Sequence, residues 1–167
     1  MTQQALVIGA GVAGPVAAMA LQKAGVDAVV YEAHPEPADN VGAFLTLQAN
    51  GVKALRAIDA EHVVTGLGFP TPVMRFRSGT GKPLGELNLA ATERDGTVSV
   101  TLRRADLYRG LCDEALRRGI RIEHARRLVN ARSVPGGVEA EFSDGSKVTG
   151  DLLVGADGVR SRVRRII

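Results

Sequence analysis

Residues 5–14 read ALVIGAGVAG, and this stretch decides the fold. Its first four residues form a short apolar run that is typical of a buried strand. The glycines that follow have the spacing G-x-G-x-x-G, and a helix-period apolar pattern continues from them to Ala24, where Gly25 predicts the end of the helix. The next apolar run, residues 28–31, is short enough for a second strand of a parallel sheet. The order strand, helix, strand predicts a Rossmann-like βαβ unit.

Each glycine of this turn has a mechanical reason in a dinucleotide site. Gly9 allows the tight turn, Gly11 lets a pyrophosphate approach the main chain, and Gly14 lets the helix pack on the strand. Free N–H groups at the helix start would then meet the phosphates. The pattern alone is weak, because glycine-rich turns also occur for packing. Glu32, after the second strand, strengthens it, since a carboxylate there accepts hydrogen bonds from a ribose diol and disfavours the 2′-phosphate of NADP.

The middle of the chain has a different texture. Residues 33–44 have the composition of a loop, and Asn50 predicts the cap of a helix that runs to about Ile58. Proline and glycine then divide residues 69–103 into short runs, which predict an antiparallel ribbon. The runs are residues 73–77, 84–89 and 98–102.

The last third returns to alternating helix and strand signals. A second amphipathic helix is predicted over residues 105–118, ended by Gly119, and residues 120–123 predict a third parallel strand. Pro-Gly-Gly and Asp-Gly turns separate residues 127–134, 138–142 and 147–149, which predicts a three-stranded meander, and residues 152–155 return to the parallel sheet. The predicted fold class is therefore α/β, a parallel βαβ sheet with an inserted β-meander and the start of an antiparallel ribbon. The buried face of the second helix is predicted to hold Leu107, Leu111, Ala115 and Leu116.

Composition narrows the classes of function. The chain has 167 residues, 45% of them apolar and 23% charged, which suits one globular domain. A net charge of +3 favours anionic ligands, but aromatic residues are only 4% and tryptophan is absent, so we expect cofactor phosphates and not nucleic acid. No apolar run approaches the roughly 20 residues that cross a bilayer, and no export signal precedes the first strand, so we expect a cytoplasmic protein without membrane contact.

The cysteine and the histidines are weak candidates for catalysis or metal binding. Cys112 is the one cysteine, cannot form an internal disulfide, and is predicted to be a small core residue of the second helix. His34, His62 and His124 are scattered without a partner carboxylate at useful spacing, so we expect structural or surface roles and no metal site. No catalytic side chain is assigned.

A second motif follows the last predicted strand. Residues 157–164 read DGVRSRVR, and Asp157, Gly158, Ser161 and Arg164 fit the pattern D-G-x-x-S-x-x-R. By spacing alone this is an Asp-Gly turn before a basic helix start. Together with the glycine turn and Glu32, it closely resembles the class A flavoprotein hydroxylases, the family of para-hydroxybenzoate hydroxylase. Arg104 to Leu107 resembles the family's R-x-x-L signature, and residues 42–50 are similar to the segment that passes the flavin ring, with Gln-Ala-Asn replacing the more usual Pro-Asn pair.

The resemblance covers essentially the whole chain and implies a cofactor and a reaction. It implies FAD, with the three glycines at the pyrophosphate, Glu32 at the adenosine ribose, Arg104 near the phosphate or ribityl arm, and Asp157 on the FAD side. NADH or NADPH would be the electron donor of a flavin-dependent monooxygenase. Its other reactants would be O2 and a small organic molecule, which we expect to be aromatic. The full set of cofactor residues that it implies is Gly9, Gly11, Val12, Ala13, Gly14, Glu32, Ala33, Arg104, Leu128, Asp157 and Gly158.

One departure from the family leaves alternatives open. Members of the family run to more than twice this length, and no G-D motif that completes the flavin contacts follows here. Residues 1–167 are therefore expected to be the N-terminal part of an FAD-binding domain, with residues 70–103 belonging to an incomplete substrate domain and a second polypeptide or a C-terminal half as partner. The alternatives are a reductase or cyclase of the same fold, a non-catalytic FAD-binding fragment, and an NAD-dependent dehydrogenase, for which the Asp157-Gly158 motif and the ribbon have no use.

Overall fold

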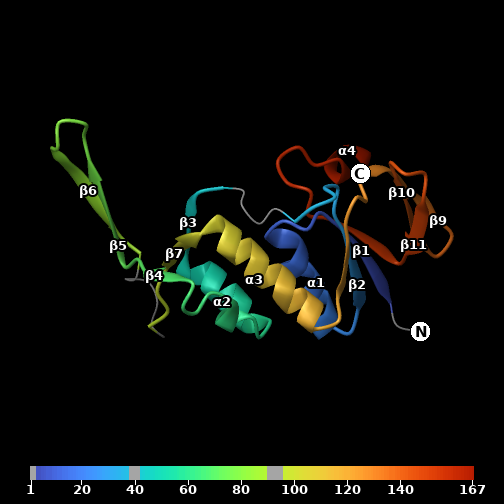
Figure 1. Cartoon of the computed structure of the whole chain (residues 1–167), viewed down its shortest axis with the longest axis horizontal. Coiled ribbons are helices and arrows are strands. Elements are labelled where there is room, and N and C mark those ends of the chain that lie inside the picture. Colours follow the sequence, from blue (N-terminus) through green and yellow to red (C-terminus); the bar gives the residue numbers. More distant parts are fainter. Residues whose placement is uncertain (1–2, 38–41, 90–95) are drawn as a thin grey trace. The chain divides into compact units, whose positions relative to one another are not determined.

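A computed structural model describes residues 3–37, 42–89 and 96–167, which divide into two compact units (Figure 1). The first unit comprises Met1–Asp39 and Tyr108–Ile167, and the second comprises Asn40–Leu107. In the described ranges, no helix has both the length and the apolarity needed to cross a membrane.

The first unit is built on a four-stranded parallel sheet. Helix α1, Ala13–Lys23, links the first two strands and ends at Gly25, whose φ is +82°. The four strands that the described residues form in this sheet were all predicted from the sequence, and the βαβ unit is confirmed. The strand order is β12-β1-β2-β8, with β1 at Gln4–Ile8, β2 at Asp27–Tyr31, β8 at Arg121–Glu123 and β12 at Leu152–Gly155.

The predicted meander packs on one face of this sheet. It is antiparallel with the order β11-β10-β9, where β9 is Leu128–Val134, β10 is Gly137–Phe142 and β11 is Lys147–Gly150. Phe142 is 1% exposed and its ring centroid lies 4.8 Å from that of Tyr31, within a core that also includes Leu6. The short helix α4, Val163–Ile166, adds Val163 to the same core.

Helix α3, Arg104–Arg117, was predicted correctly except for one residue of its buried face. Leu107 and Leu111 are 1% exposed and Ala115 is fully buried, but Leu116 is 54% exposed. Successive residues turn about 100° round a helix, so Leu116 lies outside the stripe that spacings of four residues define. Cys112 is half-buried, with its Sγ 3.8 Å from the carbonyl oxygen of Ala10, so it lies at the margin of the core and not inside it.

The second unit contains a three-stranded antiparallel sheet and helix α2. The strand order is β3-β7-β4, with β3 at Phe44–Leu47, β4 at Gly68–Pro70 and β7 at Val100–Arg103, while α2 is Ala49–Ala57 and a 3-10 turn, η1, is Glu61–Val63. The predicted cap of α2 is wrong, because Asn50 lies inside the helix. Instead, the hydroxyl of Ser99, which is 1% exposed, accepts the N–H of Ala49 at 3.2 Å.

The predicted ribbon is confirmed for two of its three runs. Strands β5, Val73–Arg77, and β6, Pro83–Asn88, form an antiparallel hairpin. The third run is not part of it, because β7 pairs with β3 and β4 instead. The hydroxyl of Thr101 lies 2.8 Å from that of Thr46 and 2.6 Å from that of Thr71, which favours this other pairing.

Replacing Phe142 tests the core between the parallel sheet and the meander. We expect Phe142→Ala to lower the free energy of unfolding by about 3–5 kcal/mol, because it removes a buried ring and leaves a cavity in the core. Leu116→Ala, on the exposed side of α3, should change it by less than about 0.5 kcal/mol. Urea unfolding measures both, and similar losses from the two variants would contradict this core.

Candidate cofactor site

Two glycines of the first turn are required by the protein's own packing. Gly9 has a φ of +103°, and a Cβ placed on it would lie 2.6 Å from the carbonyl oxygen of Ala156. A Cβ on Gly14 would lie 1.8 Å from the carbonyl oxygen of Gly9, which no side chain tolerates. The main chains of β1, α1 and the segment after β12 therefore meet at this turn without side chains between them.

Gly11 is different, because nothing in the described chain requires it. A Cβ on Gly11 would have no heavy atom within 4 Å, and its φ lies outside the left-handed region. The space beside this α-carbon is open, although the glycines on either side are tightly packed. The absence of a side chain at Gly11 therefore fits a ligand that approaches the main chain, as the sequence predicted.

The start of α1 lies next to this open space and is polar. Val12 occupies the N-cap position, the described residues provide no side-chain hydrogen bond to the cap, and the first turn holds no acidic residue. The first N–H groups of a helix have no partner within the helix and carry a partial positive charge. Ala13 begins the helix, and Pro15 lies in the first turn, where its missing N–H costs nothing.

Glu32 joins the glycine turn to the end of β2. Its Oε2 accepts the N–H of Ala10 at 2.7 Å and its Oε1 accepts the N–H of His34 at 2.9 Å, so Ala33 lies in a loop fixed at both sides. A carboxylate has about four acceptor positions, and these two bonds leave capacity for hydroxyl donors. The bond from Ala10 was not predicted, and the spacing of an acidic residue after the second strand gives no signal for it.

Asp157 organises the turn that follows β12. Its Oδ1 accepts the hydroxyl of Ser161 at 2.5 Å, and its Oδ2 accepts the N–H groups of Arg162 at 2.5 Å and Val163 at 3.1 Å. Partial burial opposes ionisation, but the bonds from Ser161 and from the Val163 and Arg162 main chain outweigh it and lower the pKa of Asp157. The carboxylate therefore holds its own loop, with Gly158 at a φ of +77°.

These segments meet because they follow adjacent parallel strands. Ile8 pairs with Gly155 and with Tyr31, Ala156 donates its N–H to Ile8 at 2.8 Å, and Gly9 donates to Tyr31 at 2.8 Å. The carboxyl ends of parallel strands are where ligands bind in open α/β sheets. The glycine turn, the Glu32 loop and the Asp157 loop thus form one site within the first unit.

Two predicted cofactor residues make other contacts in the structure. Leu128 is 5% exposed and its side chain belongs to the core with Phe142, so only its main chain is available to a ligand. Arg104 belongs to the second unit, where it donates its N–H to Ala43 at 2.8 Å. A Cβ on Gly42 would lie 2.9 Å from the Cδ of Arg104, so the arginine side chain covers that glycine.

Several arginines bind carboxylates of the protein itself. Arg117 and Arg118 both bind Glu114, which is 4% exposed, with closest N–O distances of 2.7 Å. Arg103 binds Asp106 and Arg126 binds Asp144 at the same distance. Within the described ranges, no group of three or more His, Cys, Asp or Glu side chains could hold a metal ion.

The sequence profile of the "FAD binding domain" family matches residues 2–167. The chain belongs to this family. The resemblance that the motifs predicted is thereby confirmed for the FAD-binding domain, and the dinucleotide motif is that of a flavoprotein domain and not of an NAD-dependent dehydrogenase.

Curated relatives of this FAD-binding domain are hydroxylases and monooxygenases. The chain is 35% identical over 163 residues to an FAD-dependent urate hydroxylase of Klebsiella pneumoniae, covering 96% of this chain and 42% of the relative. It is 34% identical over 164 residues to a 3-amino-4-hydroxybenzoate 2-monooxygenase of Streptomyces cremeus, covering 96% and 41%. The chain therefore spans about two fifths of the length of these relatives.

Solved structures agree in fold. The crystal structure of Klebsiella pneumoniae HpxO in complex with FAD and uric acid matches with a TM-score of 0.84 at 34% identity, covering 97% of this chain and 41% of that one. The tetrameric form of 2-methyl-3-hydroxypyridine-5-carboxylic acid oxygenase matches with a TM-score of 0.82 at 29% identity, covering 98% and 42%. The predicted fold class is thus shown for the part that these proteins share with the chain.

Asp157→Asn tests whether this carboxylate holds the second motif together. We expect the variant to lose about 1 kcal/mol of stability at neutral pH, because the charged acceptor of three donors is removed. Because the pKa of Asp157 is lower in the folded than in the unfolded protein, its charge stabilises the fold at any pH above the ordinary pKa of aspartate. This stability is lost as the pH falls through the lowered pKa. The difference from the wild type should therefore shrink in acid.

Urea unfolding across the acidic range measures this difference. Asp113→Asn is the matched control, because Asp113 is an exposed aspartate of α3. A loss from Asp157→Asn that stays constant with pH, or equals that of the control, would show that the charge of Asp157 is not what the loop uses.

Proposed function

We propose that this domain binds FAD with its pyrophosphate against the main chain of the glycine turn. The observation that carries the proposal is the open space at Gly11 between two glycines that the fold itself requires. The N–H groups at the start of α1, from Val12 and Ala13 onward, would supply donors and partial positive charge to the phosphates. Glu32 would accept the hydroxyls of the adenosine ribose with the acceptor positions that Ala10 and His34 leave.

The other predicted residues complete the proposed contacts. Ala33 follows Glu32, and Leu128 would contribute its main chain beside the adenosine part. Asp157, fixed by Ser161, would position the main chain of Gly158 on the flavin side, and Arg104 would contribute a cation to the phosphate or ribityl arm. When bound, FAD would supply the redox chemistry between a nicotinamide donor, NADH or NADPH, and O2. The residues of this chain bind and orient it, and none is proposed as a general acid or base.

For the whole protein we propose a flavin-dependent monooxygenase that hydroxylates a small aromatic or heterocyclic substrate. Support comes from the relatives, whose names describe hydroxylation of urate and of an aminohydroxybenzoate. We propose that the β5–β6 hairpin contributes to a substrate-binding sheet completed by a further part of the protein, because an isolated two-stranded hairpin is marginally stable in water. A cytoplasmic location agrees with the single cysteine.

Gly11→Val tests the pyrophosphate position. A branched side chain would fill the space that the phosphates need, while it meets no protein atom within 4 Å at its Cβ. We expect the affinity for FAD to fall at least roughly tenfold, which is about 1.4 kcal/mol, with little change in thermal unfolding of the FAD-free protein. Flavin fluorescence quenching measures the affinity.

Two matched glycine variants separate binding from folding. Gly85→Val, in β6, also meets no atom within 4 Å and should leave FAD affinity unchanged. Gly14→Ala should destabilise the fold itself, because its Cβ would collide with the carbonyl oxygen of Gly9. Unchanged flavin affinity in Gly11→Val would refute the proposed site.

The test of the proposed activity uses the whole protein, purified from cells that express its gene. Urate and 3-amino-4-hydroxybenzoate serve as probes, with NADH or NADPH and isotopically labelled O2. We expect oxidation of the nicotinamide that a probe accelerates, and one labelled oxygen atom in the product. Bound FAD with reduction of an isoprenoid and no O2 requirement would establish a reductase or cyclase instead. Bound FAD without any oxidation of NADH or NADPH would establish a non-catalytic binding module.

A further inference from the structure

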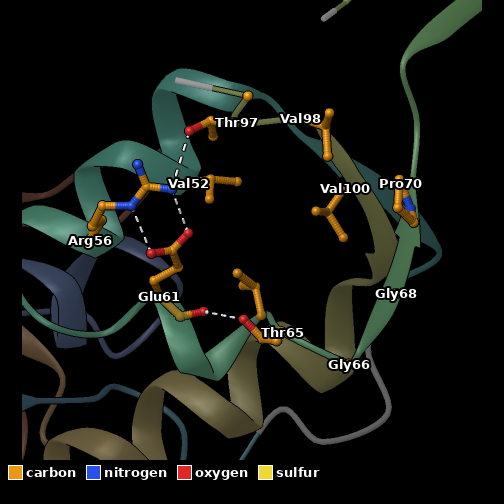
Figure 2. A pocket seen from close by; sticks show the side chains of 12 residues that line it. Val52, Arg56, Glu61, Thr65, Gly66, Gly68, Pro70, Thr97, Val98 and Val100 are labelled. Atoms are coloured by element: carbon orange, nitrogen blue, oxygen red, sulfur yellow. Dashed lines mark hydrogen bonds and ion pairs between the residues drawn. The ribbon is translucent and has the colours of Figure 1, made fainter. Parts of the chain in front are cut away.

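The second unit contains a half-open cavity of about 310 Å³ that none of the proposed cofactor residues lines (Figure 2). It lies between α2, the turn after η1, strand β4 and the start of β7. Its volume is at the lower end of the range of about 300–1,000 Å³ for small-molecule sites. The wall side chains that Figure 2 labels include Val52, Val98 and Val100, with Pro70 at the edge.

The walls of the cavity are mostly apolar. Val52 and Val64 are 5% and 2% exposed, so both are buried and only a small part of each side chain faces the cavity. Gly66 and Gly96 also line the cavity, and both have a positive φ, which favours glycine whatever the space around it. The cavity is therefore bounded mainly by aliphatic side chains, with no side chain at these two positions.

The charged groups of the cavity are paired with each other. Arg56 donates from Nε to Oε2 of Glu61 and from Nη2 to Oε1, both at 2.7 Å. Its Nη2 also donates to the hydroxyl of Thr97 at 3.1 Å (Figure 2). A bidentate pair of this kind is neutral as a whole, and an ionic ligand would have to break it or lie unpaired beside it. The pair is partly exposed, with the Arg56 and Glu61 side chains 45% and 36% accessible, and it offers no net opposite charge to an anion or a cation.

The cavity is on the face of β7 opposite to the threonine cluster. Val100 lines the cavity, while Thr101, the next residue of the strand, bonds to Thr46 of β3 and to Thr71. Successive residues of a strand point to opposite faces of a sheet. The cavity and the threonine cluster therefore lie on opposite faces of this sheet.

We propose that this cavity is a second ligand site, which takes a small uncharged molecule of one apolar ring. The valine walls would bury the ring, while the paired Arg56 and Glu61 would give a charged analogue no net attraction to offset the loss of its hydration. The aminohydroxybenzoate named for one relative is a carboxylate at neutral pH, so a ligand of this cavity belongs to a different chemical class. The inference does not depend on FAD binding or on a monooxygenase reaction.

Phenol and benzoate are matched probes, because they share the ring and differ in charge. Titrated into the 167-residue chain without FAD and followed by amide chemical shifts in NMR, phenol should bind saturably and shift Gly66, Gly68 and Thr97. Benzoate should bind at least tenfold more weakly. Tighter binding of benzoate, or no saturable shift with phenol at these residues in the folded chain, would overturn the proposal.

Two substitutions at one position separate a filled cavity from a damaged fold. Val98 is half-buried and precedes β7, so Val98→Phe should fill the cavity and weaken phenol binding at least tenfold, whereas Val98→Ala should keep it. Thermal unfolding identifies a variant that fails to fold, and Val100→Phe replaces Val98→Phe in that case. Gly11→Val should bind phenol normally, so failure of this cavity proposal and failure of the proposed FAD site are distinguishable.

Phenol binding that is unchanged in a folded phenylalanine variant would show that phenol binds elsewhere, and would refute this site.

Discussion

The first unit depends on one close contact between main chains, that of Gly14 with the carbonyl oxygen of Gly9. At this point α1 packs on the end of β1 without a side chain between them, since a Cβ would lie 1.8 Å from that oxygen. Gly9 in turn touches the main chain after β12, so three segments converge where their strands end. This convergence brings free helix N–H groups next to the open space at Gly11. The feature that makes the fold possible is therefore also the one that prepares the proposed phosphate site.

Two carboxylates make this arrangement rigid before any ligand binds. Glu32 fixes the loop after β2 to the glycine turn through the N–H of Ala10, and Asp157 fixes the loop after β12 through Ser161 and the start of α4. Loops held by their own hydrogen bonds lose little conformational entropy when a ligand binds. The side chain of Asp157 thus has a positioning role, while the proposed contact with a cofactor falls to its loop. Glu32 combines both, because its hydrogen bonds to the protein leave further acceptor positions.

Sequence alone predicted the parts whose physics is local. The βαβ unit and the meander follow from apolar runs, turn residues and glycine spacing. The Asp157 and Arg104 motifs came from the family resemblance, and the structure places the glycine turn and the Asp157 loop together. The errors have other causes. Helix α2 begins at Ala49, before the expected cap at Asn50, where Ser99, distant in sequence, accepts the N–H of Ala49; β7 pairs with strands that come before the ribbon. Glu114 is buried and binds Arg117 and Arg118, three and four residues further along the helix. From sequence alone, this charge pattern is the same as that of a solvent-exposed helix face. Tertiary contacts decide such cases, and they have no local signal.

The central claim is that the main chain at Gly11 and the start of α1 receives the pyrophosphate of FAD. A crystal structure of the chain with FAD tests it most directly. The account predicts pyrophosphate oxygens within hydrogen-bonding distance of N–H groups in residues 11–13, with the ribose hydroxyls on Glu32. A bound flavin whose phosphates lie away from this turn, with the space beside Gly11 still open, would contradict it.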